Sequence, residues 1–236
     1  MKNAQRWIAA FDNHGDMCDR RAVELFFDFK RRWKPHVAIH GGDNFDFRAL
    51  RRKASDEERR DGIGQDIADG CEFLRRMKPD VWLRGNHDER IFDIVGGDDR
   101  KLADLVCPIL DDITEAAGAA VVRPYDKWKG RHWQGGTLFV HGMHHGIHAA
   151  AQAVNDFKAD VVFGHIHAFS VASSPSVDGA LYGYSSGSLC NNRMDYCRAS
   201  PKTLRHETGW LYGYTIGKRT LVFQAKIING VLYAGH

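Results

Sequence analysis

The chain has 236 residues, of which 43% are hydrophobic and 27% are charged, with 33 basic and 30 acidic side chains and a net charge of +3. This is the composition of a globular domain, and the charge is too balanced to indicate nucleic-acid binding by itself. No apolar run approaches the roughly 20 residues of a membrane span. Five cysteines without a CxxC pair argue against a disulfide framework or a cysteine zinc site, and they predict a cytoplasmic location.

Short apolar runs recur along the first 170 residues and predict strands that are buried on both faces. In chain order they are RWIAAF (6–11), HVAIH (36–40), VWL (81–83), TLFVH (137–141) and DVVF (160–163). Each run leads into a cluster of polar residues. Since ligands bind outside the carboxyl ends of the strands in such sheets, these clusters are candidates for one site.

Helical patterns separate the strands. Apolar residues with a period near 3.6 predict helices over 22–33, 67–74, 102–109 and 147–157. Pro35 and Pro79 stop the first two, and Pro108 is expected to interrupt the third. Ser55 and Glu58 have the spacing of a capping box, which predicts a further helix start.

The alternation of strand and helix predicts a largely parallel sheet with crossover helices. After residue 175 the pattern changes to antiparallel hairpins, with turns at Gly217-Lys218 and Asn229-Gly230. No linker or internal repeat interrupts the chain, so residues 1–236 are expected to form a single α/β domain.

The polar clusters hold carboxylates and imidazoles but no thiolates, a donor set that suits Mn²⁺, Fe or Zn²⁺. Asp12 with His14, and His165 with His167, are two residues apart, so each pair can share one face of an extended segment. The clusters contain more ligands than one ion needs. Two ions bridged by a carboxylate would use them all.

Five of these clusters, in this order, resemble the signature blocks of the calcineurin-like metallophosphoesterase superfamily. The blocks are DNH (12–14), GDNFD (42–46), GNHD (85–88), HG (141–142) and GHIH (164–167). The resemblance covers residues 5–170. It implies a four-layer α-β-β-α sandwich, in which two mixed β-sheets pack face to face between flanking helices.

The resemblance also implies a role for each residue. It assigns seven metal ligands: Asp12, His14 and His167 for a first ion, Asn86, His141 and His165 for a second, and Asp43 as the bridge between them. His87 resembles the catalytic histidine of the superfamily, and Asp46 would orient it. The implied cofactors are two divalent or trivalent ions, with Mn as the first expectation and Fe, Zn or Ni as alternatives.

Two cations would lower the pKa of a bridging water and neutralise charge that develops on phosphorus. We therefore expect in-line attack by a bridging hydroxide, with His87 as general acid or phosphate clamp. The expected substrate is a phosphodiester in a nucleic acid or nucleotide, because phosphoprotein phosphatases of the superfamily usually carry GNHE where this chain has GNHD. DNA-repair nucleases of the SbcD type share only the catalytic core.

Two other functions remain open. One is a phosphomonoesterase that acts on a nucleotide or phosphoprotein, and the other is a non-catalytic metal-binding scaffold. Several polar residues also have two readings. Arg84 and Arg90 either clamp phosphate or are solvated, Asp88 either assists the catalytic histidine or caps a helix, and His144 and His145 either line the pocket or lie on a solvated loop.

Three stretches bear on the substrate. The basic segments FRALRRKASDEERR (47–60) and RPYDKWKGRHW (123–133) suit single-stranded nucleic acid, or are a charged helix face and an ordinary β-hairpin. The third, SGSLCNNRMDYCR (186–198), is expected to fold over the site as a specificity loop. Cys190 and Cys197 within it are expected to be bystanders rather than a redox pair.

Overall fold

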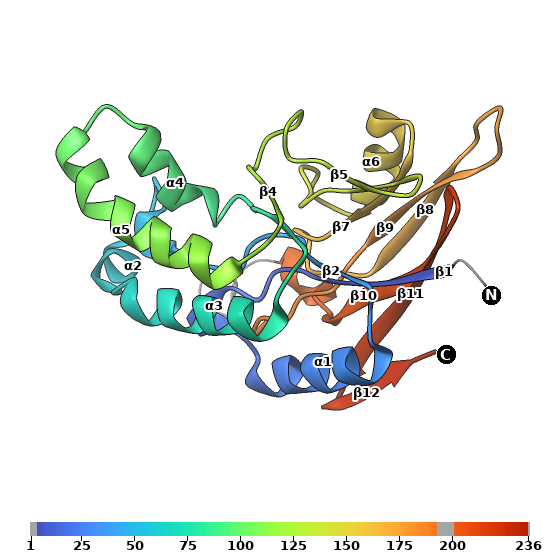
Figure 1. The fold of residues 1–236 in the computed structure, drawn as a ribbon, viewed down its shortest axis with the longest axis horizontal. Helices are drawn as coiled ribbons and strands as arrows, with labels where there is room; N and C mark the ends of the chain where they lie inside the picture. Colours follow the sequence, from blue (N-terminus) through green and yellow to red (C-terminus); the bar gives the residue numbers. More distant parts are fainter. Residues whose placement is uncertain (1–3, 193–200, 236) are drawn as a thin grey trace.

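The structure is a computed structural model that describes residues 4–192 and 201–235. Two β-sheets lie face to face, with helices on their outer sides (Figure 1). The seven-stranded sheet has the order β12-β11-β10-β1-β2-β3-β4. Its strands are β1 (Ala4–Ala10), β2 (Val37–His40), β3 (Val81–Leu83), β4 (Val121–Arg123), β10 (Thr208–Ile216), β11 (Arg219–Ile228) and β12 (Val231–Ala234).

Strands β1 to β4 run parallel, and β10 joins β1 in the antiparallel direction. The second sheet is five-stranded, with the order β5-β6-β7-β9-β8 and a parallel centre formed by β6, β7 and β9. Its strands are β5 (His132–Gln134), β6 (Thr137–Phe139), β7 (Asp160–Phe163), β8 (Ser170–Ser174) and β9 (Leu181–Ser185).

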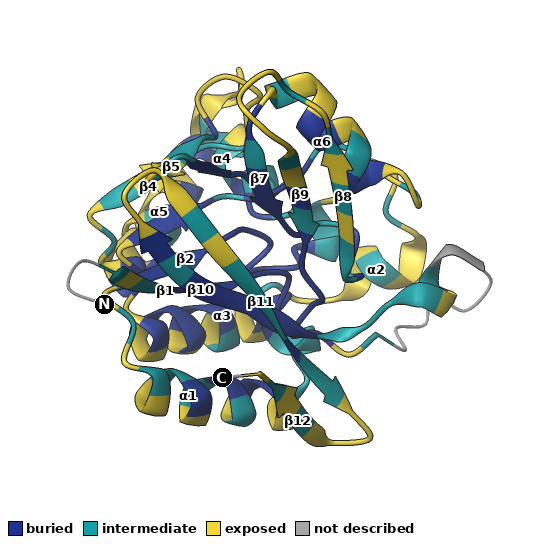
Figure 2. Cartoon of the chain, turned by 90° about the vertical axis from the view of Figure 1, so that its right-hand side faces the viewer, coloured by how far each residue is buried: buried dark blue, intermediate teal, exposed yellow. Residues whose placement is uncertain are grey.

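A continuous apolar core fills the space between the sheets. Trp7 of β1 meets Phe139 of β6 edge to face, with ring centroids 5.1 Å apart, and both side chains are fully buried. Figure 2 shows the contrast along the larger sheet, where β1 and β10 are buried and β11 alternates between intermediate and exposed positions. This core holds the two parallel centres against each other.

Helices cover the outer faces. They are α1 (Arg20–Trp33), α2 (Asp56–Arg60), α3 (Gly64–Met77), α4 (Glu89–Gly96), α5 (Arg100–Ala117) and α6 (Ala149–Phe157), with 3₁₀ turns η1 (Gly15–Met17), η2 (Arg48–Leu50) and η4 (Pro201–Arg205). On α1, Phe26 and Phe29 pack on Trp210 of β10. Burying each of these phenylalanines contributes about 1.5–3 kcal/mol. Helix α6 covers the smaller sheet.

The predicted four-layer sandwich of two mixed sheets is therefore confirmed. The capping box is present in both halves, since Ser55 Oγ accepts from Glu58 N at 3.2 Å and Glu58 Oε2 accepts from Ser55 N at 2.7 Å. Both C-terminal hairpin turns also form as predicted. Helix α4 and strands β8 and β9 were not predicted.

Two local predictions were wrong. Pro108 does not interrupt its helix but lies inside α5, at an exposed position where water can bind the carbonyl group that lacks its partner. The segment 123–133 is not a β-hairpin, because β4 at its start belongs to the larger sheet and β5 at its end to the smaller one. It is a crossing between the layers.

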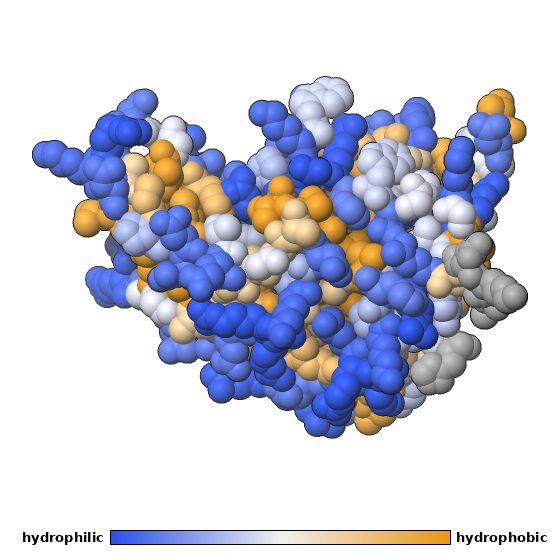
Figure 3. Space-filling view, in the orientation of Figure 1, coloured by the Kyte–Doolittle hydropathy of each residue, from blue (hydrophilic) through white to orange (hydrophobic). Residues whose placement is uncertain are grey.

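The face of the molecule in Figure 3 is mostly hydrophilic, with hydrophobic side chains gathered over α4 and α5. Leu105 of α5 is 73% exposed, and Leu102 is 43% exposed. Within residues 4–192 and 201–235, no helix combines the length and the apolar character that crossing a membrane requires.

Candidate metal centre

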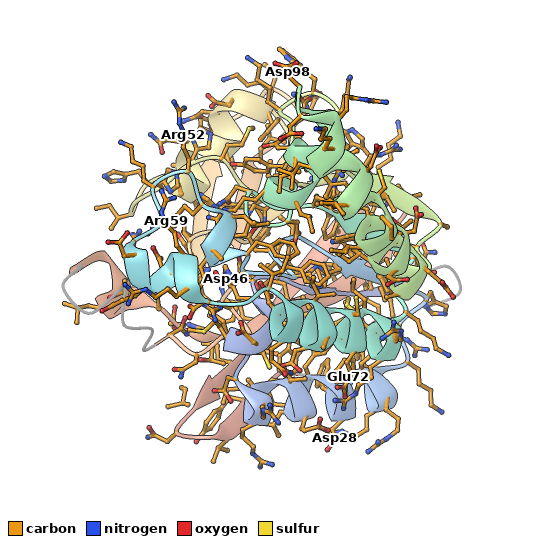
Figure 4. The ribbon with its side chains drawn as sticks, turned by 90° about the vertical axis from the view of Figure 1, so that its left-hand side faces the viewer. Asp28, Asp46, Arg52, Arg59, Glu72 and Asp98 are labelled. Carbon is orange, nitrogen blue, oxygen red and sulfur yellow. The ribbon has the colours of Figure 1, made fainter. Side chains whose placement is uncertain are left out.

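The predicted ligands come together where five strands end. Asp12, Asp43 and Asn86 follow the parallel strands β1, β2 and β3, whereas His141 follows β6 and the GHIH block follows β7. Because the two sheets pack face to face, the turns after these strands meet at one end of the sandwich. In Figure 4, Asp46 lies inside the molecule, while Arg52 and Arg59 point outward.

The first group of ligands surrounds His167. Its Nε2 atom lies 3.2 Å from Nε2 of His14 and 3.6 Å from Oδ1 of Asp12. Oδ2 of Asp43 lies 4.0 Å from Nε2 of His14. Asp12, His14 and Asp43 are each at most 2% exposed. The three residues assigned to the first ion are thus neighbours, with Asp43 beside them.

The second group surrounds Nε2 of His141. This atom lies 3.2 Å from Oδ2 of Asp43, 3.2 Å from Oδ1 of Asn86 and 3.3 Å from Nδ1 of His165. The Asp43 carboxylate therefore touches both groups, as a bridging ligand must. Of the competitors of His141 in the sequence, His144 pairs with Asp156, and His145 contacts His165.

The backbone at the site is unusual. Among residues 4–192 and 201–235, ten non-glycine residues have positive φ angles, and five of them are predicted ligands: Asp12, His14, Asp43, His165 and His167. Of the others, three are helix C-caps, one is the N-cap of η2 and one lies in the β11–β12 turn. A left-handed backbone costs on the order of 1–3 kcal/mol per residue and is concentrated at functional sites. Here it turns five donor side chains toward one place.

The donor set fits a cation. Oδ1 of Asp12 is fully buried and has no hydrogen-bond partner in the structure. A buried oxygen of this kind costs free energy unless an ion or a water molecule binds it. Among the predicted ligands, two pairs of imidazole nitrogens face each other at 3.2 and 3.3 Å. Lone pairs at that distance repel unless a proton or a metal lies between them. The residues present can therefore hold metal ions.

The pKa values follow the same pattern. Burial lowers the pKa of both His141 and His165, but Asp43 outweighs it at His141 and raises that pKa to about 9. At His165 burial and the adjacent His141 together lower the pKa to about 3. Burial opposes ionisation of Asp43, yet His141 and His87 hold the pKa of Asp43 well below its usual value. The positive charge therefore favours His141 over His165, beside an ionised carboxylate.

Outer contacts orient these ligands. Nδ1 of His141 lies 3.0 Å from the carbonyl oxygen of Gly41, which leaves Nε2 to face Asp43. The backbone N–H of His165 donates to Oδ2 of Asp12 at 2.8 Å, leaving Oδ1 for a cation. Partners of this kind fix the ring orientation and tautomer of ligating groups.

His87 lies at the edge of the cluster with its ring against Asp46. Its Nδ1 atom is 3.0 Å from Oδ1 of Asp46 and 2.9 Å from the Asp46 carbonyl oxygen, so Nε2 is the nitrogen left for a substrate. Oδ1 of Asp46 also lies 3.0 Å from Nδ1 of His14. The predicted contact between Asp46 and His87 is thus present, and Asp46 orients a predicted ligand as well.

The cleft beside the cluster has a volume of about 270 Å³. His14, Asp43, His87, His165 and His167 line it together with the cationic side chains of Arg48, Arg51, Arg90 and Arg205. Arg90 also donates to the carbonyl oxygen of Asp46 at 2.7 Å. Arg84 is elsewhere, since it pairs with Glu89 at 3.1 Å and lies over the ring of Phe92.

Comparison with known structures identifies the fold. A metallophosphoesterase from Sphaerobacter thermophilus aligns with a TM-score of 0.50 at 15% identity, over 95% of this chain and 89% of that chain. The chain has the metallophosphoesterase fold.

Two further structures align at lower TM-scores. Vacuolar Protein Sorting 29 from Cryptosporidium parvum gives 0.49 at 14% identity, covering 98% of this chain and 96% of that one. Yfce, a phosphoesterase from E. coli, gives 0.42 at 13% identity, covering 96% of each chain. No protein-family model and no curated protein matches the sequence.

Within this metallophosphoesterase fold, Asp88 takes neither of its two expected roles. Its carboxylate accepts from the backbone N–H of Phe45 and of Gly85, both at 2.9 Å, and it makes no side-chain cap at the start of α4. Burial, reinforced by Asp43, raises the pKa of Asp88 to about 7. Asp88 therefore ties the GDNFD turn to the GNHD turn from behind the site.

The structure separates His144 from His145. His145 lines the cleft, and its Nδ1 lies 3.1 Å from Nε2 of His165, whereas His144 pairs with Asp156 at 3.0 Å. Three residues that line the cleft had no individual role in the sequence reading: Arg48, Arg205 and His206. Arg48 had a signal, because it lies two residues after the second block. Arg205 and His206 lie far from any block in the sequence, and only the tertiary fold places them in the cleft.

Replacing Gly85 by alanine is expected to disrupt the centre. A Cβ atom there would overlap the carboxylate and the backbone nitrogen of Asp43. Overpacking of this kind costs about 1–3 kcal/mol. Gly85→Ala should therefore unfold at lower urea concentration and bind less metal. Gly62→Ala is the matched control, since a Cβ atom there has no neighbour within 4 Å. Equal metal content in both variants would contradict the prediction.

Asp66 should make stability depend on pH. It accepts from the backbone N–H of Asp46 at 3.1 Å and of Phe47 at 2.6 Å. Burial raises the pKa of Asp66 to about 6, although these two bonds act in the opposite direction. Since the folded-state pKa exceeds the ordinary value, ionisation destabilises the folded state as pH rises from about 4 to about 6.

The free energy of unfolding, taken relative to that of Asp66→Asn, should therefore fall by about 3 kcal/mol across this pH window. Urea denaturation of both metal-free proteins at pH values from about 4 to about 7 measures this difference. A difference that stays constant with pH would show that Asp66 ionises as an ordinary carboxyl group.

Proposed function

We propose that the protein is a metal-dependent phosphoesterase that hydrolyses a phosphodiester, in a nucleic acid or a nucleotide, with two metal ions. One observation carries the proposal. Asp43 and six further carboxylate, imidazole and amide side chains from five separate turns converge, and five of these seven residues have a left-handed backbone. Because strained backbone is concentrated at functional sites, five such residues in one place favour a functional role for this cluster.

The residues of the site have different roles in the proposed reaction. Asp12, His14 and His167 would hold one ion, Asn86, His141 and His165 the other, with Asp43 shared. Bound ions would supply a nucleophilic water at neutral pH and neutralise phosphate charge. His87 directs Nε2 into the cleft, where it can protonate the leaving alkoxide. Asp46 holds the ring in that orientation through Nδ1.

The cleft supports a substrate with more than one phosphate or with a charged leaving group. Arg51, from the segment after the second block, and Arg205, from η4, both line it. Cations on two parts of the wall suit a diester within a longer anionic chain. Asp88, the last residue of GNHD, is not among the residues that line the cleft, so the arginine side chains are the feature of the cleft that favours a diester.

The test compares two model substrates. Purified protein with added Mn²⁺ is assayed on bis-p-nitrophenyl phosphate and on p-nitrophenyl phosphate, with chelator-treated protein as the control. Faster hydrolysis of the diester is the expected result, and faster hydrolysis of the monoester would establish the phosphomonoesterase instead. Hydrolysis of neither by the metal-loaded protein would favour the scaffold. A panel of single-stranded DNA, RNA and cyclic nucleotides then narrows the substrate.

We also propose Mn²⁺ as the native ion and the cytoplasm as the location. Manganese suits a site of carboxylate, amide and imidazole donors. Four described cysteines are free thiols, among them the exposed Cys107, and a reducing compartment preserves such groups. Metal analysis of protein purified without added metal tests the first of these statements.

A further inference from the structure

Cys190, expected from the sequence to be a bystander, lies against a predicted metal ligand. It follows β9, is fully buried, and forms an isolated antiparallel bridge with Cys18 that fixes its backbone. Its Sγ atom lies 3.6 Å from Nδ1 of His167. Nε2, the other nitrogen of the same ring, faces Asp12 and His14. The sulfur and the proposed first metal site therefore lie on opposite sides of one imidazole.

This arrangement constrains the tautomer of His167. To bind a metal through Nε2, the ring must carry its proton on Nδ1, and that N–H needs an acceptor. Within the described part of the chain, the hydrogen-bond partner of Nδ1 is Cys190 Sγ. A buried sulfur thus takes the place that a carboxylate or carbonyl oxygen usually has behind a ligating histidine.

The thiol has acceptors for its own proton. Oγ of Ser188 lies 3.4 Å from Sγ, and Oδ1 of Asn192 lies 3.6 Å from it. Ser188 Oγ in turn lies 2.9 Å from Asn192 Oδ1. The S–H group can donate into this pair while the sulfur accepts from His167, so the chain of contacts is satisfied without ionising the thiol.

We propose that Cys190 is a positioning residue that orients His167 and fixes its tautomer for the first metal ion. The inference rests on the metal site of the proposed function. The competing role is direct ligation, because Sγ, one nitrogen of His14 and one nitrogen of His167 lie within 4.8 Å of one another. Positioning is favoured because the sulfur meets Nδ1 and not the nitrogen that faces Asp12.

The experiment titrates Co²⁺ into the metal-free full-length protein and records calorimetry and the visible spectrum. Cys190→Ala should weaken binding at one of the two sites by about 10–100-fold, as loss of an outer partner does elsewhere. Cys190→Ser should retain most of the affinity, because a hydroxyl oxygen can accept the same bond. Cys71→Ala, which empties a buried cysteine site in a separate apolar cluster, controls for the loss of packing.

Each outcome decides something. Selective weakening in Cys190→Ala, rescue in Cys190→Ser and no sulfur-to-cobalt charge-transfer band support positioning. Wild-type affinity in Cys190→Ala, or an equal loss in Cys71→Ala, would overturn it, and a charge-transfer band that Cys190→Ala removes would establish ligation instead. Failure of the wild type to bind Co²⁺ would remove the metal site, and with it the proposed function as well. None of these readouts depends on turnover.

Discussion

Replacing His87 by asparagine is expected to lower kcat by about 10²–10⁴-fold, the usual contribution of a general acid. Metal binding should survive, because His87 meets Asp46 through Nδ1 and its Nε2 remains 3.9 Å from Oδ2 of Asp43. Steady-state kinetics on bis-p-nitrophenyl phosphate and metal analysis of the same sample measure both quantities. The predicted pattern is an inactive protein with its full metal content.

The matched control is His144→Asn, since His144 pairs with Asp156 and does not line the cleft. It should leave activity unchanged. His87, His14 and Asp43 also lie close enough together to hold an ion between them. Loss of metal in His87→Asn would therefore make His87 a ligand, and full activity would remove it from the reaction.

Replacing Asp43 by asparagine should abolish the centre. Its carboxylate lies 3.2 Å from Nε2 of His141 and 4.0 Å from Nε2 of His14, so it is the only predicted ligand that belongs to both groups. Asparagine keeps the volume and can still accept the bond from the backbone N–H of His87. The bridging negative charge is lost. Because the loss of an outer partner lowers metal affinity by about 10–100-fold, the loss of a ligand should lower it further.

Metal analysis should then find fewer than two ions in Asp43→Asn, and hydrolysis should fall to the level of chelator-treated protein. The fold should remain, because a buried carboxylate is replaced by a neutral isostere. Asp28→Asn, on the exposed face of α1, is the control that leaves the centre intact (Figure 4). An Asp43→Asn protein with two ions and wild-type activity would contradict the assignment of the bridge.

Much of the site could be predicted from the sequence, because the patterns that identify its residues lie within short segments of the chain. A strand signal followed at once by a polar cluster tells where each donor lies, and the ordered blocks tell which donors belong together. His141 illustrates this, since its place at the end of the TLFV strand distinguished it from His144 and His145. The same locality explains why the strands that lead into the five blocks, the capping box and the C-terminal turns were predicted.

The predictions that were wrong concern residues whose contacts come from distant segments of the chain. Asp88 is the last residue of the GNHD block, but its partner Phe45 comes from another turn, so its role in joining the two turns has no local signal. Pro108 would usually end a helix, yet packing of α5 carries the helix through it. The 123–133 segment has the composition of a hairpin loop and instead connects two sheets.

The sequence by itself determined the donors, their order and the strands that end in them, because residue type and hydrophobic period are properties of short segments. Only the tertiary structure decided which atoms of those donors face one another, since that depends on how two sheets pack. It placed Arg205 in the cleft, turned His145 toward His165 and set a buried thiol behind His167. The two contacts to His165 and His167 join residues 20 and 23 positions apart, which is beyond the short segments in which a local pattern carries information.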